Sequence, residues 1–137
     1  MSKKEDMIKY IKKSCDIIKV NLIHTKLPSG NKKEINNKLD EFFSYFENAV
    51  TSSDPFIENV NNMRANGIWL PDKINDSSVR QNYFNVAKGY FFQVLNDENL
   101  QNVIYTEQSV YTKTINSVLR NINKVLNDII DGKVILE

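Results

Sequence analysis

The chain has 137 residues and a net charge of +1, with 41% apolar and 26% charged residues. A chain of this length and composition can bury a hydrophobic core of its own, as one globular domain does. These values exclude an intrinsically disordered chain, which has fewer aromatic residues and a larger net charge. We therefore expect a single domain over residues 1–137.

The first predicted helix follows Ser2 and Glu5, whose spacing matches a capping box. Apolar residues then recur every three or four positions, which keeps them on one helical face about 80° wide. The run Pro28-Ser29-Gly30 is expected to end this helix. The apolar face consists of Ile8, Ile11, Cys15, Ile18 and Leu22.

Two further helices are predicted before residue 70. The second spans residues 32–50, with its apolar face formed by Ile35, Leu39, Phe42, Phe43, Phe46 and Val50. Asp54 and Pro55 are typical of the first residues of a short third helix, and Gly67 is placed to end it. An apolar loop containing Trp69 and Leu70 follows, before Pro71.

The fourth predicted helix, residues 78–96, is apolar over about half of its circumference, which is typical of a helix in the middle of a bundle. Asp76-Ser77-Ser78 is expected to cap it. Gly89 lies inside it and costs roughly 1 kcal/mol relative to alanine, which favours a close helix crossing at this residue.

The last part of the chain predicts a short helical turn after residues 97–99 and then a long helix over 106–131. The long helix has apolar residues in alternating steps of four and three, and Gly132 is expected to end it. Residues 132–137 form a short apolar C-terminal tail. The whole pattern predicts an all-α protein, a compact bundle of five to six helices with the helix around 78–96 central.

The compartment follows from cysteine content and hydropathy. Cys15 is the only cysteine, so an intramolecular disulfide is excluded. The N-terminal residues are charged and lead into an amphipathic stretch, unlike a signal peptide. No run of about eighteen apolar residues occurs, so we expect no membrane-spanning segment and a cytoplasmic protein.

A catalytic or metal site is not predicted. Metal binding and nucleophilic catalysis need several suitable side chains close together, and Cys15 and His24 are the only soft ligands. Helical spacing directs these two side chains to opposite faces. Asp54, Asp76 and Asp97 are typical of helix caps. We therefore expect no cofactor and rank an enzyme last, with the aromatic residues of helix 78–96 as the lining of any pocket.

Basic residues are distributed unevenly. Residues 1–40 carry ten lysines and five carboxylates, a net charge of +5, whereas residues 41–137 have a net charge of −4. Two basic helical surfaces are predicted, one formed by Lys9, Lys12, Lys13 and Lys19 and one by Lys113, Arg120 and Lys124. Such residues can contact phosphates. The pI of about 7.8 and the scarcity of arginine favour solvated helix faces instead.

Trp69 is the only tryptophan and has two interpretations. Tryptophan is enriched among the residues that anchor protein interfaces. A tryptophan in a loop above a helical core also covers its own domain, and we favour this second interpretation.

The leading functional hypothesis is a non-enzymatic protein–protein interaction module, either a small regulator or inhibitor or a subunit of a larger assembly. Its candidate contacts are Trp69, Leu70, Ile135 and Leu136, together with the basic first helix. The alternative is a nucleic-acid-associated protein that uses the basic face of the first or the last helix. The partner is unidentified, and homo-oligomers are compatible with the sequence.

Overall fold

The structure is a computed structural model that describes residues 3–51, 76–131 and 133, with side chains described from residue 82 onward in the second range. Five helices and no strands are present in these ranges. The helices are α1 (Lys3–Leu22), α2 (Ser29–Thr51), α4 (Asp76–Leu95), α5 (Glu98–Glu107) and α6 (Val110–Ile130). The prediction of an all-α bundle is confirmed.

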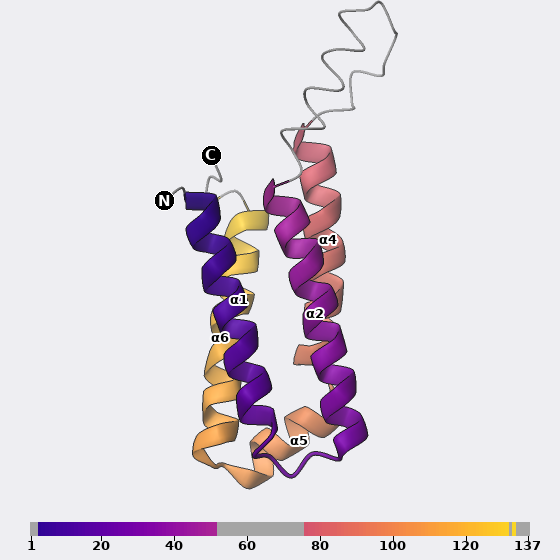
Figure 1. Cartoon of the computed structure of the whole chain (residues 1–137), viewed down its shortest axis with the longest axis vertical. Helices are drawn as coiled ribbons and strands as arrows, with labels where there is room; N and C mark the ends of the chain where they lie inside the picture. The colour runs from indigo at the N-terminus through magenta and orange to yellow at the C-terminus, as the bar shows by residue number, and fades with distance from the viewer. Residues whose placement is uncertain (1–2, 52–75, 132, 134–137) are drawn as a thin grey trace, which may run out of the picture.

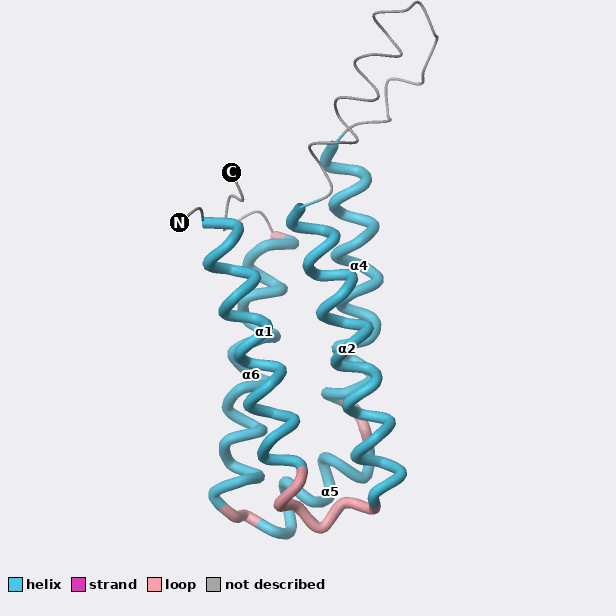
Figure 2. The backbone as a smooth tube through the Cα atoms, viewed as in Figure 1, coloured by secondary structure: helices cyan, strands magenta, loops and turns pink. Residues whose placement is uncertain are grey.

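The four long helices run side by side and alternate in direction along the chain (Figure 1). α1 packs against α2 and α6, and α4 packs against α2 and α6, so each long helix has two long neighbours. The short helix α5 crosses one end of the bundle, where the loops before α2 and α6 also lie (Figure 2). We call this the closed end, and the end where α1 begins and α6 finishes the open end.

The connection between α1 and α2 differs from the prediction. α1 ends at Leu22, and the backbone amides of His24 and Thr25 donate to the carbonyls of Asn21 and Leu22 over 3.1 Å. Pro28 precedes α2, and its carbonyl accepts the first helical hydrogen bond, from the amide of Lys32, at 3.0 Å. The Pro-Ser-Gly run therefore starts the second helix and does not end the first, because a proline is well suited to a helix start.

The boundary between the last two predicted helical segments differs from the prediction. α5 ends at Glu107, Gln108 adopts a positive φ of 47°, and α6 begins at Val110 rather than at residue 106. The hydroxyl of Ser109 accepts from the amide of Thr112, and the amide of Ser109 donates to the hydroxyl of Thr112. This reciprocal capping box stabilises a new helix start and makes the break favourable.

The core lies between the long helices and receives side chains from every helix described. Four phenylalanines form its centre between α2 and α4. Their ring centroids are 5.4 Å apart for Phe42 and Phe91 and 5.8 Å apart for Phe46 and Phe84. The other large, fully buried side chains include Ile11, Ile18, Leu22, Ile35, Leu39, Leu100, Ile115 and Leu119.

Helix α4 corresponds to the helix predicted over 78–96. It is one of the four long helices that form the bundle. It packs mainly along α2 and also contacts α5 and α6. Val86 and Phe92 on its outer side are 41% and 37% exposed. The wide apolar surface of α4 thus includes a part that faces solvent, and the helix is not enclosed on all sides.

Gly89 does not mark a close helix crossing. A Cβ atom built at this residue would meet no atom within 4 Å, so the space beside it is open. The expectation of a tight crossing is wrong here, because α4 meets α2 through the side chains of Phe84 and Phe91 and not through glycine.

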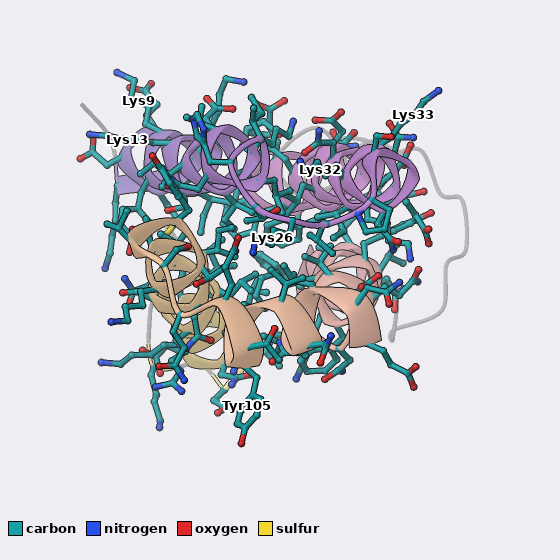
Figure 3. All side chains as sticks on the ribbon, turned by 90° about the horizontal axis from the view of Figure 1, so that it is seen from below. Lys9, Lys13, Lys26, Lys32, Lys33 and Tyr105 are labelled. Carbon is teal, nitrogen blue, oxygen red and sulfur yellow. The ribbon has the colours of Figure 1, made fainter. Side chains whose placement is uncertain are left out.

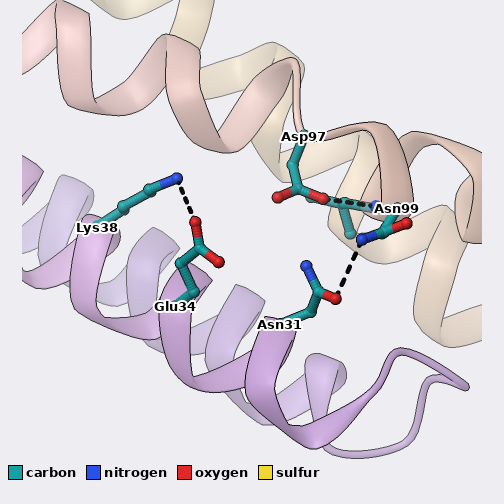
Figure 4. A network of polar contacts seen from close by, with 6 residues as sticks. Asn31, Glu34, Lys38, Asp97 and Asn99 are labelled. Atoms are coloured by element: carbon teal, nitrogen blue, oxygen red, sulfur yellow. Dashed lines mark hydrogen bonds and ion pairs between the residues drawn. The ribbon is translucent and has the colours of Figure 1, made fainter.

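Polar contacts join helices at the closed end. The amide of Asn99 in α5 donates to the side-chain oxygen of Asn31 in α2 at 3.0 Å (Figure 4). Asp97 caps α5, as predicted, by accepting from the amide of Leu100 at 2.9 Å. The Asn99–Asn31 contact attaches α5 to α2, and the cap at Asp97 fixes the start of α5 at this end of the bundle.

Candidate interaction surface

The predicted basic surface of α1 is partly turned toward α2. The ammonium of Lys19 pairs with the carboxylate of Asp40, and the ammonium of Lys12 lies 5.3 Å from the ring centroid of Phe43. Both contacts connect α1 to α2. Lys9 and Lys13 lie instead at the outer corner of α1 (Figure 3). The four lysines therefore do not form one continuous patch.

The predicted basic stripe of α6 faces solvent, because Lys113, Arg120 and Lys124 are all exposed. α6 is also a direct neighbour of α1. α1 has six lysines and three carboxylates, and α6 has three basic residues and one carboxylate. The outer lysines of α1 and the basic stripe of α6, which are distant in the sequence, thus lie on neighbouring helices, and each of these helices has an excess of basic residues.

A second stripe on α1 points toward solvent beside α6. Tyr10, Lys13, Ile17 and Val20 are spaced by three, four and three residues, which places them within about 80° of one another. Tyr10 and Ile17 lie on the side of α1 opposite Lys12 and Lys19, which face α2. Tyr10 is 45% and Val20 58% exposed, while Ile17 is half-buried.

α6, the neighbour of α1, also contributes exposed apolar surface. Val110 in its first turn is 68% exposed. It borders a shallow, open hollow together with Lys113, Thr114, Ser117 and Val118. Val118 is half-buried and packs against the core. The hollow thus has an apolar floor and a cationic edge.

The contact between His24 and Tyr111 shows which parts of these two helices are level. Their rings stack with centroids 4.6 Å apart at the closed end, where α1 has just ended and α6 begins. Because the helices are antiparallel and each residue rises about 1.5 Å, Val20 lies roughly level with residue 115 and Ile17 with Val118. Ile17 and Val20 are therefore level with the part of the hollow nearest Val118, whereas Tyr10 lies nearer the open end and Val110 nearer the closed end.

We use the name α1–α6 face for this surface. It consists of Tyr10, Lys13, Ile17 and Val20 on α1 and of Val110, Lys113, Thr114, Ser117 and Val118 on α6. Arg120 and Lys124 continue its basic edge along α6. Apolar side chains bordered by cations can bind a surface that is itself apolar at its centre and anionic at its edge.

Exposed aromatic and apolar residues also occur on α4 and α5. Tyr105 on α5 is 79% exposed and points away from the bundle on the side opposite α1 and α2 (Figure 3). On the outer side of α2 and α4, Tyr45 stacks with Tyr90, with centroids 5.7 Å apart, and borders a smaller hollow with Tyr83 and Val86. The three tyrosines are half-buried and mainly cover one another.

The surroundings of Cys15 and His24 indicate structural roles for both residues. Burial raises the pKa of the Cys15 thiol to about 12, so this thiol stays protonated and is a poor nucleophile or ligand. His24 is exposed at the surface, as predicted, and stacks on Tyr111. No group of three His, Cys, Asp or Glu residues in the described ranges is arranged to hold a metal ion.

Two groups of predicted contact residues fall outside the part of the chain that the structure describes. They are Trp69 and Leu70, in the predicted loop, and Ile135 and Leu136, in the predicted tail. The short third helix before Gly67 also lies outside it. These expectations stay predictions.

The sequence contained a signal for part of the α1–α6 face that the prediction did not use. The spacing of Tyr10, Lys13, Ile17 and Val20 is helical, but these residues lie beside a more apolar stripe that explains the burial of α1. Val110 has no comparable signal, because the predicted helix 106–131 placed it in a continuous helix instead of in the first turn of α6.

None of the helices in the described ranges is long and apolar enough to cross a membrane. Comparison with known proteins gives no further identification: no protein-family model, no curated protein and no solved structure matches this chain.

Proposed function

We propose that this protein is a protein–protein interaction module that binds its partner through the α1–α6 face. The observation that supports this most directly is the exposure of Val20 and Val110, which are 58% and 68% exposed on neighbouring helices. The core is already filled by other residues of the same helices. An apolar surface that the fold itself does not bury is typical of an interaction site.

The composition of this face supports the same function. Interfaces combine an apolar centre with a polar rim, and tyrosine and arginine are enriched in them. Tyr10, Ile17 and Val118 supply the apolar centre, and Arg120 lies on the rim. A regulator, an inhibitor and a subunit of an assembly would all need such a surface.

The experiment compares two variants in the cell from which the chain comes. Val20→Asp combined with Val110→Asp introduces charge into the α1–α6 face without changing the core. Val86→Asp is the matched control, because Val86 is an exposed valine on α4, away from this face. We expect the wild-type protein and the control to be recovered in a complex of larger mass by native mass spectrometry.

The double variant should be recovered alone. A wild-type protein that is solitary in its own cell would contradict the proposed function. Circular dichroism of both variants must show the wild-type helix content, since loss of folding would also remove a complex.

Nucleic-acid binding is the second candidate, supported by the position of Lys13, Lys113 and Arg120 on one side of the bundle. This function requires affinity for duplex DNA or RNA that falls steeply as salt is raised. Replacing Lys113, Arg120 and Lys124 by glutamine should then reduce both affinity and salt dependence. Absence of binding at low salt would exclude this candidate.

A further inference from the structure

We propose that the occupant of the α1–α6 face is an amphipathic helix of a partner protein, with acidic residues along its flanks. This inference rests on the proposed function and specifies the partner. It is carried by three observations: the helical spacing of the stripe on α1, the hollow on the neighbouring α6, which overlaps in height with Ile17 and Val20, and the excess of positive charge on both helices.

The geometry fits a helix better than an extended segment. Two antiparallel helices form a shallow groove along their line of contact, and a third helix can place its own apolar stripe there. Tyr10, Ile17 and Val20 supply contacts on one side of this line, and Val110 and Val118 supply contacts on the other. The described ranges contain no sheet edge to which an extended strand could add.

The length of the surface limits the length of the occupant. Tyr10 and Val20 are ten residues apart in α1, which corresponds to about 15 Å along the helix axis. The hollow beside Val110 extends the surface toward the closed end. A helix of about three to four turns covers this distance.

The charges on the face favour an acidic occupant. Lys13 lies within the stripe of α1, while Lys113 and Arg120 border the hollow and its continuation on α6. The carboxylates on these two helices are those of Glu5, Asp6, Asp16 and Asp128. Three of these four lie toward the open end, so acidic residues of the occupant would be placed near the middle and the closed end.

Two other occupants fit the face less well. A second copy of this chain would have to present an acidic helix long enough to cover the face, but α2, with three lysines and four carboxylates, is almost neutral, and the acidic helix α5 has only ten residues. A nucleic-acid backbone would match the basic edge but would leave the apolar side chains of Tyr10, Val20 and Val110 without contacts. The acidic amphipathic helix matches both parts of the face.

The test uses two displayed peptide libraries of about 18 residues. Both vary apolar residues at helical spacings of three and four, and they differ at the flanking positions, which are glutamate in one library and lysine in the other. We expect the full-length protein to enrich the glutamate library alone. Enriched peptides should bind at least about tenfold more weakly when their flanking glutamates are replaced by lysine.

The binding site is then located with variants of the protein. Val20→Asp with Val110→Asp should abolish peptide binding, and Lys113→Glu with Arg120→Glu should weaken it by about tenfold or more. Val86→Asp should leave binding unchanged. NMR shift changes on adding an enriched peptide should be confined to α1 and the neighbouring part of α6.

Several outcomes would overturn the inference. These are equal enrichment of the two libraries, no enrichment of either, binding that survives the Val20 and Val110 changes, dimerisation through this face, and tighter binding of duplex DNA than of any peptide. If the native complex still depends on Val20 and Val110 while no helix binds, the proposed function stands and the occupant is different. If no native complex exists, the proposed function itself fails.

Discussion

His24 and Tyr111 stack with their ring centroids 4.6 Å apart, although 86 residues separate them in the sequence. This contact joins the end of α1 to the first turn of α6 at the closed end of the bundle. With these two residues level, Ile17 and Val20 on α1 lie at about the height of Val118 and Ile115 on α6.

The stacking contact should contribute measurably to stability. We expect a double-mutant cycle of His24→Ala and Tyr111→Ala to give a coupling of about 0.5–1.5 kcal/mol, the range found for aromatic pairs. Urea denaturation of the four proteins measures it. Tyr105→Ala is the control, because Tyr105 is 79% exposed and should change the free energy of unfolding by about 0.5 kcal/mol or less. A coupling near zero would show that the stack does not align the helices.

Two adjacent phenylalanines should differ strongly in their effect on stability. Phe91 is fully buried against Phe42, so Phe91→Ala should lower the free energy of unfolding by about 3–5 kcal/mol through loss of burial and cavity formation. Phe92 is 37% exposed, so Phe92→Ala should lower the free energy of unfolding much less. Chemical denaturation of both variants checks this order. Similar losses would contradict the position of α4 in the bundle.

Gly89→Ala should stabilise the protein by roughly 0.5–1 kcal/mol. Alanine restricts the unfolded chain and favours the helix, and its Cβ would meet no atom within 4 Å at this residue. The midpoint of thermal or urea unfolding measures the gain. A loss of stability would contradict the open space beside Gly89 and would indicate the close helix crossing that the sequence predicts.

Cys15 should be unreactive in the folded protein. Burial raises the pKa of its thiol from 9.0 to about 12, so the thiolate is scarce at neutral and mildly alkaline pH. A thiol reagent such as Ellman's reagent should label the native protein far more slowly than the protein in denaturant. Equal labelling rates would place Cys15 at the surface.

The same shift affects stability at high pH. Because the pKa of Cys15 is higher in the folded than in the unfolded chain, its stabilising contribution is fully present below 9.0 and is lost as the pH rises toward about 12. We expect Cys15→Ala to lose less stability than the wild type over this range. Urea denaturation of the two proteins at several pH values checks the sign.

The helices themselves follow from local patterns in the sequence. The stripe of Ile11, Cys15 and Ile18 is buried as its spacing predicts, and Asp97 caps α5 as its position indicates. Helix boundaries were less predictable where two signals compete. α6 begins at Val110 rather than at residue 106, where the capping box of Ser109 and Thr112 starts it.

The sequence by itself determined that this protein is helical, which faces of α1 and α6 are apolar and where their basic residues lie, because helical periodicity is a local property. Only the tertiary structure decided that α1 and α6 are neighbours. Their packing turns Lys12 and Lys19 toward α2 and leaves Tyr10, Val20 and Val110 exposed on one side. Contacts between helices distant in the sequence depend on how all the apolar faces fit together, and no single helix carries that information.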